Sequence, residues 1–164
     1  SDTPFTASLM YAKFNKKTID FTSYLIIVPR TSKIKLWSFE IDFVTLTHSI
    51  LEPNGLSITT PLGTILHTGD WKIDPNPLIG GSVDEKKLKK IGEKGVSVMI
   101  CDSTNIFSPG RAGSESDVRD SLLRIMETKT KRVLGTSFAS TVARRESIFN
   151  CASKTGRTIC VVGR

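Results

Sequence analysis

The feature that most constrains the fold of this chain is a cluster of two prolines and two glycines between residues 75 and 81. Proline and glycine interrupt regular secondary structure, and the pattern of apolar residues differs on the two sides of the cluster. We therefore predict a boundary between two lobes at this point, with the first lobe over residues 1–77 and the second over residues 78–164.

The first lobe has the pattern of short antiparallel strands that follow one helix. Thr3 is a suitable N-cap and Pro4 a suitable first residue for a helix that continues to about Asn15. Further on, a Pro-Leu-Gly sequence at residues 61–63 separates two β-rich runs, which predicts a hairpin. The predicted strands of this lobe are residues 24–28, 34–39, 41–46, 56–60 and 64–67.

The second lobe alternates helices with strands. A charged helix over residues 84–93 precedes a continuous apolar run at residues 96–101, which is typical of a strand buried on both faces. Ser114 and Asp117 form a capping-box pattern at the start of a helix that ends near Lys129. Strands at 133–136 and 158–162, with a helix over 140–154 between them, complete a β-α-β-α-β order. We therefore predict a mixed α/β fold whose second lobe contains a parallel sheet covered by helices.

The charge of the chain indicates an acidic partner or a lysine-rich surface. Lys and Arg number 23 against 16 Asp and Glu, for a formal charge of +7. Nucleic acid is the commonest partner of such proteins, and a solvated surface explains the charge equally well. No apolar run approaches the length of a membrane span, and the first residues lack a signal-peptide pattern. We therefore expect a cytoplasmic protein in which Cys101, Cys151 and Cys160 are buried free thiols.

The two histidines of the sequence, His48 and His67, lie in one stretch that also contains Asp70. His48 follows a predicted strand and Asp70 follows a later one, so the hairpin between them can return both groups to one edge of the sheet. One imidazole and one carboxylate could be half of a hydrolytic metal site. A turn histidine and a turn or cap aspartate are the more common interpretation. For His67 the favoured interpretation is a hydrogen-bonded strand histidine.

Two further polar segments follow predicted strands of the second lobe, where sites form in open α/β sheets. Asp102 could orient a ligand or anchor an Asx-turn, and the sequence favours neither role. Hydroxyl groups in residues 136–141 lie at a helix start, which suits a phosphate. Arg144 and Arg145 lie one turn further, where they could pair with that phosphate. Plain N-capping by Ser140 explains this segment at least as well.

Five short motifs, taken together and in order, resemble the bacterial ribonuclease J family, which belongs to the β-CASP branch of the metallo-β-lactamase superfamily. They are Thr47-His48-Ser49, His67-Thr68-Gly69-Asp70, Cys101-Asp102-Ser103-Thr104-Asn105, Ser137-Phe138-Ala139-Ser140 and Val162-Gly163-Arg164. Each motif is weak alone, but five in register are quite specific. The resemblance implies the remnant of a metallo-β-lactamase αββα sandwich, followed by the first half of a β-CASP domain.

The resemblance also implies roles for individual residues. His48 and Asp70 match two metal-binding motifs of the family, whose members use two divalent ions, zinc or manganese. Asp102 matches the first β-CASP motif, which has a supporting catalytic role. The implied activity is 5′→3′ exonuclease and endonuclease cleavage in RNA processing and decay. The loop from Ser137 to Ser140 is similar to the segment that lines the RNA path in the family. Together with the helix start that follows it, this loop gives four candidate residues for RNA or phosphate binding, namely Ser137, Ser140, Thr141 and Arg144.

The sequence departs from the family pattern at the histidines. The His-x-His-x-Asp-His motif, which supplies most metal ligands, and the late β-CASP histidines are absent, because the chain contains two histidines in all. We therefore expect a segment of the enzyme that binds metal poorly and is inactive by itself. RNA is the expected partner, no membrane is involved, and a homo-oligomeric state of the intact enzyme stays open. The alternatives are a non-catalytic RNA-binding or interaction module and another hydrolase of the metallo-β-lactamase fold.

Overall fold

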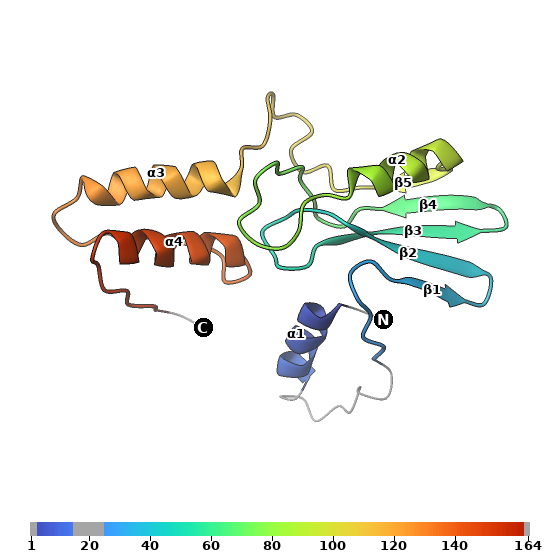
Figure 1. Cartoon of the computed structure of the whole chain (residues 1–164), viewed down its shortest axis with the longest axis horizontal. Helices are drawn as coiled ribbons and strands as arrows, with labels where there is room; N and C mark the ends of the chain where they lie inside the picture. The colour runs from blue at the N-terminus through green and yellow to red at the C-terminus, as the bar shows by residue number, and fades with distance from the viewer. Residues whose placement is uncertain (1–2, 15–24, 163–164) are drawn as a thin grey trace.

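The computed structural model of the chain describes residues 3–14 and 25–162 (Figure 1). The first described element is helix α1 (Pro4–Phe14), as the Thr3-Pro4 signal predicts. Thr3 is buried, and its carbonyl accepts a 2.9 Å hydrogen bond from the N–H of Ala7. The N–H of Phe5 donates to the Glu52 carboxylate at 2.8 Å, so the start of α1 is tied to the segment before the third strand.

A single mixed sheet of five strands forms the centre of the described structure. Its order is β1 (Lys33–Leu36), β2 (Phe39–Thr45), β3 (Asn54–Thr60), β4 (Gly63–His67) and β5 (Val98–Ile100). The first four strands pair with one another in antiparallel fashion, whereas β5 pairs with β4 in parallel. The antiparallel character of the first lobe and the hairpin around residues 61–63 are confirmed.

Two-residue turns connect β1 to β2 and β3 to β4, because tight turns match the twist of antiparallel strands. In the first hairpin Leu36 pairs with Phe39, so Trp37 and Ser38 form the turn. Trp37 has a φ of 51°, a left-handed conformation that is uncommon for a residue with a bulky side chain. Its side chain is 91% exposed, so no packing contact compensates for this conformation.

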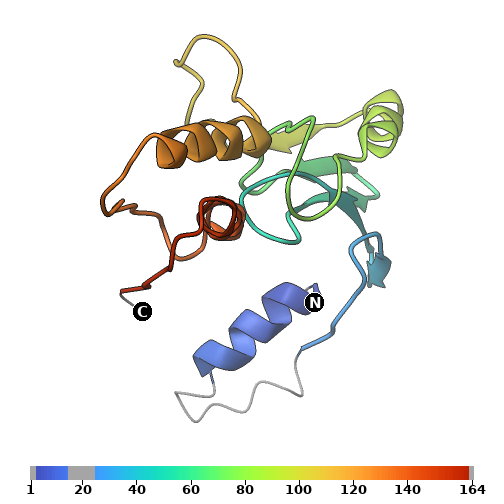
Figure 2. The same ribbon diagram turned by 60° about the vertical axis from the view of Figure 1, so that its left-hand side comes forward.

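Three helices follow the antiparallel strands, namely α2 (Glu85–Lys94), α3 (Glu115–Glu127) and α4 (Val142–Lys154). α2 lies along the sheet, whereas α3 and α4 lie side by side beyond one end of it (Figures 1 and 2). The predicted capping box at α3 is confirmed. The Ser114 hydroxyl accepts from the N–H of Ser116 in the first turn, and the Asp117 carboxylate accepts from the N–H of Ser114.

α3 and α4 run in the same direction. At their starts Arg144 contacts Glu115 at 3.2 Å, and beyond their ends Arg157 donates to the carbonyls of Met126 and Lys131 at 3.2 and 2.8 Å. Parallel neighbouring helices require the chain to return between them, and residues 129–141 make that return without helix or strand. This is the helix arrangement that a β-α-β-α-β order predicts.

The mixed α/β fold class is confirmed, but several predicted strands are not present. Residues 133–136 and 158–162 are not strands, because neither segment has a neighbouring strand in the described part of the chain with which to form a ladder. The run 34–39 is divided by the Trp37 turn, so predicting one strand there was wrong. Of the predicted strand 24–28, the first residue lies outside the described residues, and the rest is not a strand.

The core is centred on β2 and the segment after it, where Val44, Leu46 and Thr47 are fully buried. The side chains of β5 are 50–52% exposed, so the prediction of a strand buried on both faces was wrong for the described chain. All three cysteines are free, as predicted, but Cys101 and Cys160 are exposed and Cys151 alone among them is buried. The division of the chain at residue 77 stays a prediction, and β5 pairs across it with β4.

None of the helices in the described ranges has both the length and the apolar character needed to cross a membrane.

Candidate functional site

The segments that carry His48, Asp70 and Asp102 meet at one end of the sheet. β2, β4 and β5 all end there, because β4 and β5 are parallel and β2 lies two antiparallel steps from β4. We call this end of the sheet the site end. Thr47 forms an isolated antiparallel bridge with Lys72, whose N–H donates to the Thr47 carbonyl at 2.9 Å. The N–H of Thr68 likewise donates to the carbonyl of Ile100 at 3.0 Å.

His48 and Asp70 flank the Thr47–Lys72 bridge. Because the bridge is antiparallel, the chain that leaves Thr47 runs beside the chain that enters Lys72. His48 is half-buried, and its Nδ1 lies 3.4 Å from the Ser49 hydroxyl, whereas Asp70 is exposed. Gly69 has a φ of 61°, which turns the chain just before Asp70. The structure therefore brings both residues to the site end, as the hairpin interval predicts.

Asp102 joins the same end through Thr68, whose hydroxyl accepts from the N–H of Asp102 at 3.4 Å. One carboxylate oxygen of Asp102 accepts from the hydroxyl and the N–H of Thr104, at 2.5 and 3.0 Å, so the Asx-turn role is present. The Thr104 hydroxyl lowers the pKa of Asp102 most, followed by the Thr104 N–H, against a small effect of burial. An electrostatic interaction with His48 lowers this pKa further.

His67 ends β4 and is exposed, and its Nδ1 accepts a 3.1 Å hydrogen bond from the N–H of Gly69. The prediction of a hydrogen-bonded strand histidine is therefore confirmed. This bond fixes the start of the turn that leads to Asp70.

The described residues do not complete a metal centre. Across residues 3–14 and 25–162, no three His, Cys, Asp or Glu side chains are grouped closely enough to hold a metal ion. His48 and Asp70 could supply two donors of the types that zinc or manganese accepts. A stable site would need further ligands, so no chemical step through a metal follows from these residues alone.

The predicted phosphate segment borders an open hollow of about 460 Å³. Four of its polar lining residues are Thr136, Ser137, Thr141 and Arg144, but Ser140 does not line it. Thr141 is the N-cap of α4 and its side chain makes no capping hydrogen bond, so the alternative of plain N-capping by Ser140 is not what the structure has.

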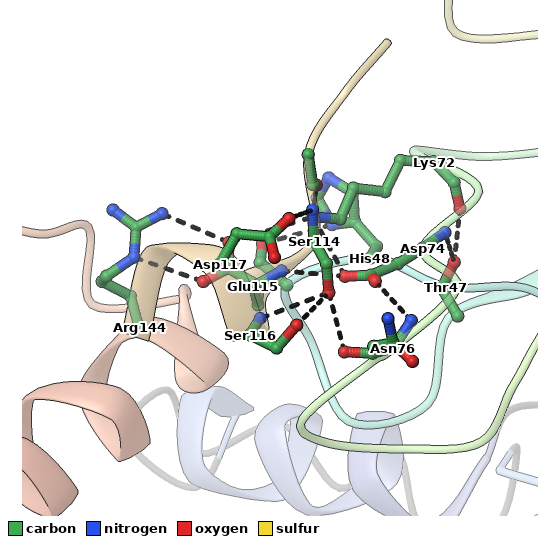
Figure 3. A network of polar contacts seen from close by, with 12 residues as sticks. Thr47, His48, Lys72, Asp74, Asn76, Ser114, Glu115, Ser116, Asp117 and Arg144 are labelled. Carbon is green, nitrogen blue, oxygen red and sulfur yellow. Dashed lines mark hydrogen bonds and ion pairs between the residues drawn. The ribbon is translucent and has the colours of Figure 1, made fainter. Parts of the chain in front are cut away.

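Arg144 is already engaged within the chain. Its guanidinium donates from Nε and Nη2 to the two carboxylate oxygens of Glu115, at 3.3 and 3.2 Å (Figure 3). This two-pronged geometry is the one that an arginine also forms with a phosphate. A phosphate in the hollow would therefore compete with Glu115 for Arg144.

Glu115 belongs to a polar network that links the site end to α3 (Figure 3). Its centre is Asp74, which is 3% exposed and which the sequence analysis did not single out. The Asp74 carboxylate accepts from the N–H groups of Asn76 and Glu115 at 2.9 and 3.1 Å, and pairs with Lys72 at 3.3 Å. The N–H of Asp74 donates at 3.0 Å to Thr47, the residue before His48.

The pKa of Asp74 reflects two opposing effects. Burial raises it, but hydrogen bonds from Ser114, Glu115, Asn76 and Lys72 together outweigh burial, so the pKa is lowered. Asp74 is thus held as a charged group inside the structure. The Asp-Pro-Asn turn at residues 74–76 was a signal for an Asx-type anchor, but it gave no indication of the distant partners.

Comparison with known proteins identifies what the chain is similar to. No protein-family profile matches it. A ribonuclease J of Sinorhizobium meliloti is 40% identical over 162 residues, which are 98% of this chain and 28% of that protein. A ribonuclease J of Helicobacter pylori is 34% identical over 163 residues, which are 99% of this chain and 24% of that protein.

The chain is homologous to a segment of ribonuclease J. It spans about a quarter of the length of these two curated relatives, at 28% and 24%. Because the ribonuclease J match covers 98% of the chain, it runs through both sides of the proline and glycine cluster and through the site end.

A solved structure supports the fold alone. The crystal structure of a protein of unknown function from Enterococcus faecalis V583 matches with a TM-score of 0.55 and 20% sequence identity. The match covers 82% of this chain and 32% of that chain. It agrees with the mixed α/β class and says nothing of activity.

Proposed function

We propose that this chain is part of a metal-dependent ribonuclease that cleaves RNA as a 5′→3′ exonuclease and endonuclease. The proposal is carried by one observation, namely that His48, Asp70 and Asp102 lie on segments that meet at the site end. The homology to proteins named ribonuclease J supports RNA as the substrate class. In this proposal His48 and Asp70 are two ligands of a pair of divalent ions, zinc or manganese.

Asp102 has a supporting role in this proposal. Its lowered pKa keeps it ionised, and Thr104 fixes its carboxylate through two hydrogen bonds. A fixed negative charge that interacts with His48 favours a defined orientation of the imidazole. Asp102 would therefore position His48 and would not itself react with RNA.

Ser137, Ser140, Thr141 and Arg144 form the proposed RNA-binding segment. Three of them line the hollow beside α4, and their hydroxyl and guanidinium groups can donate hydrogen bonds to a phosphate there. Arg144 is the one cation among them, and a phosphate that uses its Nε and Nη2 donors would compete with its partner Glu115. RNA binding at this segment is thus coupled to the polar network of Asp74.

The isolated chain should not turn over RNA, because two donors bind a divalent ion weakly. Purified chain is incubated with labelled RNA and with Mn²⁺ or Zn²⁺, and the expected result is no metal-dependent cleavage. Clear cleavage that disappears in His48→Ala would contradict the inactivity of the isolated segment.

The ligand assignment is tested by NMR, because the chain has two histidines that can be told apart. On titration with Zn²⁺ the imidazole signals of His48 should shift, and Asp70→Ala should reduce that shift. His67 is the internal control, since its Nδ1 accepts from the Gly69 N–H. A shift at His67 without one at His48 would overturn the assignment.

A non-catalytic RNA-binding module is the second candidate function. It is favoured by the incomplete metal-ligand set in the described residues together with the net charge of +7. RNA binding that persists in a chelator and in Asp70→Ala would support this candidate over the nuclease segment.

A further inference from the structure

Helix α2 carries two stripes of side chains with different charge patterns. Residues 85, 89 and 93 are Glu, Lys and Glu, four residues apart, so this stripe has opposite charges at each step. Residues 86, 90 and 94 have the same spacing but are all lysine. Residues four apart lie on one helix face, and like charges at that spacing destabilise a helix by about 0.2–0.5 kcal/mol per pair. The lysine stripe therefore costs stability that the neighbouring stripe avoids.

The three lysines of this stripe, Lys86, Lys90 and Lys94, are exposed and line an open hollow of about 520 Å³ beside β2. None of them forms an ion pair with another residue of the described ranges. We call them the lysine row. Successive members are about 6 Å apart along the helix axis, since each residue rises about 1.5 Å. A line of cations fits an extended polyanion better than one small anion.

The acidic residues on the floor of this hollow are already engaged. Asp42 pairs with Lys87 at 2.6 Å, and Asp84 caps α2 by accepting from the N–H of Lys87 at 3.0 Å. Lys87 also donates to the Phe43 carbonyl at 2.8 Å, which anchors α2 on β2. Lys87 thus neutralises Asp42, and the three lysines of the row outnumber the two remaining carboxylates of the lining, Asp84 and Glu93.

The lysine row is directed away from the site end. The N–H of Asp84, just before α2, donates to the carbonyl of Thr45 at 3.0 Å, three residues before His48. α2 then runs along the sheet toward its opposite end (Figure 1). Lys86 is therefore the member nearest the site end, and Lys94 is the farthest from it.

We propose that the lysine row is a docking surface for the RNA backbone, which extends the contact between RNA and protein beyond the site end along α2. The choice of RNA as the polyanion rests on the proposed function. The contact itself needs no metal and no residue of the candidate site. Lysine contacts of this kind recognise phosphates without regard to sequence.

The test measures the salt dependence of binding to a labelled single-stranded RNA by the full 164-residue chain. Fluorescence anisotropy is recorded in EDTA, so that failure of the proposed metal ligands cannot alter the result. The row variant is K86Q/K90Q/K94Q. The control variant is K89Q/K129Q/K131Q, which removes the same charge from exposed lysines outside the row. Circular dichroism checks that both variants fold.

In the row variant the slope of log K against log salt concentration should be smaller in magnitude by about 2. Each phosphate contact with a single strand contributes about 0.7 to this slope, and the variant removes three lysines. Between about 50 and 200 mM salt, the unmodified chain should then lose about 20-fold more affinity than the row variant. The control should keep the slope of the unmodified chain. Equal slopes in both variants, or no binding by the unmodified chain, would overturn the proposal. If a polyglutamate peptide bound more tightly than RNA and this binding depended on the lysine row, the proposal of RNA as the partner would be wrong, and an acidic protein segment would be the partner instead.

Discussion

Replacing Asp74 with asparagine should destabilise the chain more than any other isosteric substitution, Asp→Asn or Glu→Gln, in the polar network around Asp74. Asparagine keeps the shape of the side chain but removes its charge and one acceptor oxygen. The carboxylate now accepts from two backbone N–H groups and pairs with Lys72, and its side chain is 1% exposed. In Asp74→Asn, one N–H faces an amide NH₂ group and Lys72 loses its nearest anion.

The magnitude follows from these contacts. A hydrogen bond to a charged group contributes about 1.5–3 kcal/mol, and a buried donor left without a partner costs about 1–3 kcal/mol. Losing one such bond and weakening the second should lower the free energy of unfolding by about 3 kcal/mol. For a chain of this size, that corresponds to a fall of about 6–12 °C in Tm.

Urea and thermal unfolding followed by circular dichroism measure the effect. Asp117→Asn is the matched control, because Asp117 is an exposed carboxylate that accepts one N–H in the capping box of α3. The control should cost about 1 kcal/mol or less. A loss below about 1 kcal/mol in Asp74→Asn, equal to that of the control, would refute the idea that Asp74 holds the network together.

The pH dependence provides an independent check on the same residue. The folded-state pKa of Asp74 is lowered from 3.8, so its charge stabilises the folded chain above that value. This contribution is lost as pH falls through the lower, folded-state pKa, because the folded carboxyl then becomes protonated as well. The stability difference between the unmodified chain and Asp74→Asn should therefore be largest near neutral pH and should narrow below about pH 3.8. A difference that stays constant to lower pH would mean that the charge of Asp74 is not responsible.

Two further substitutions test other parts of the structure. Glu115→Gln removes the anion that pairs with Arg144, so RNA should bind at the hollow several-fold more tightly in an anisotropy assay. An unchanged affinity would show that Arg144 does not contact a phosphate. Trp37→Asn should raise the free energy of unfolding by about 0.5–1 kcal/mol, because asparagine tolerates a φ of 51° and removal of the exposed indole costs no packing. The urea midpoint should therefore rise, and a lower midpoint would contradict this.

Local signals in the sequence predicted the elements whose cause is local. The capping box of Ser114 and Asp117 and the hairpin at residues 61–63 depend on residues a few positions apart, and both are present. The strands at 133–136 and 158–162 failed for the opposite reason. A strand exists only with a partner strand, and an apolar run carries no information about whether that partner is available.

In the candidate site, too, the features with a local cause were predicted and those that depend on distant residues were not. The hairpin interval correctly brought His48 and Asp70 to one end of the sheet, because strand direction follows from short connections. The partner of Arg144 could not be predicted, since Glu115 lies 29 positions earlier and meets Arg144 only because α3 and α4 run in parallel. Asp74 was missed for this reason as well, since one of its partners, Glu115, is 41 positions away.

The parallel arrangement of α3 and α4 explains why Glu115 faces Arg144. Each helix has partial positive charge at its N-terminus, so two parallel starts repel each other and favour a nearby anion. Arg144, in the first turn of α4, adds a cation where a cation is unfavourable, and Glu115 and Asp74 offset it. Any phosphate that displaced Glu115 would bring the same negative charge to the same two helix starts. Glu115 therefore supplies the negative charge that the two helix starts favour, and in the proposed function a phosphate of RNA would compete with its carboxylate for Arg144.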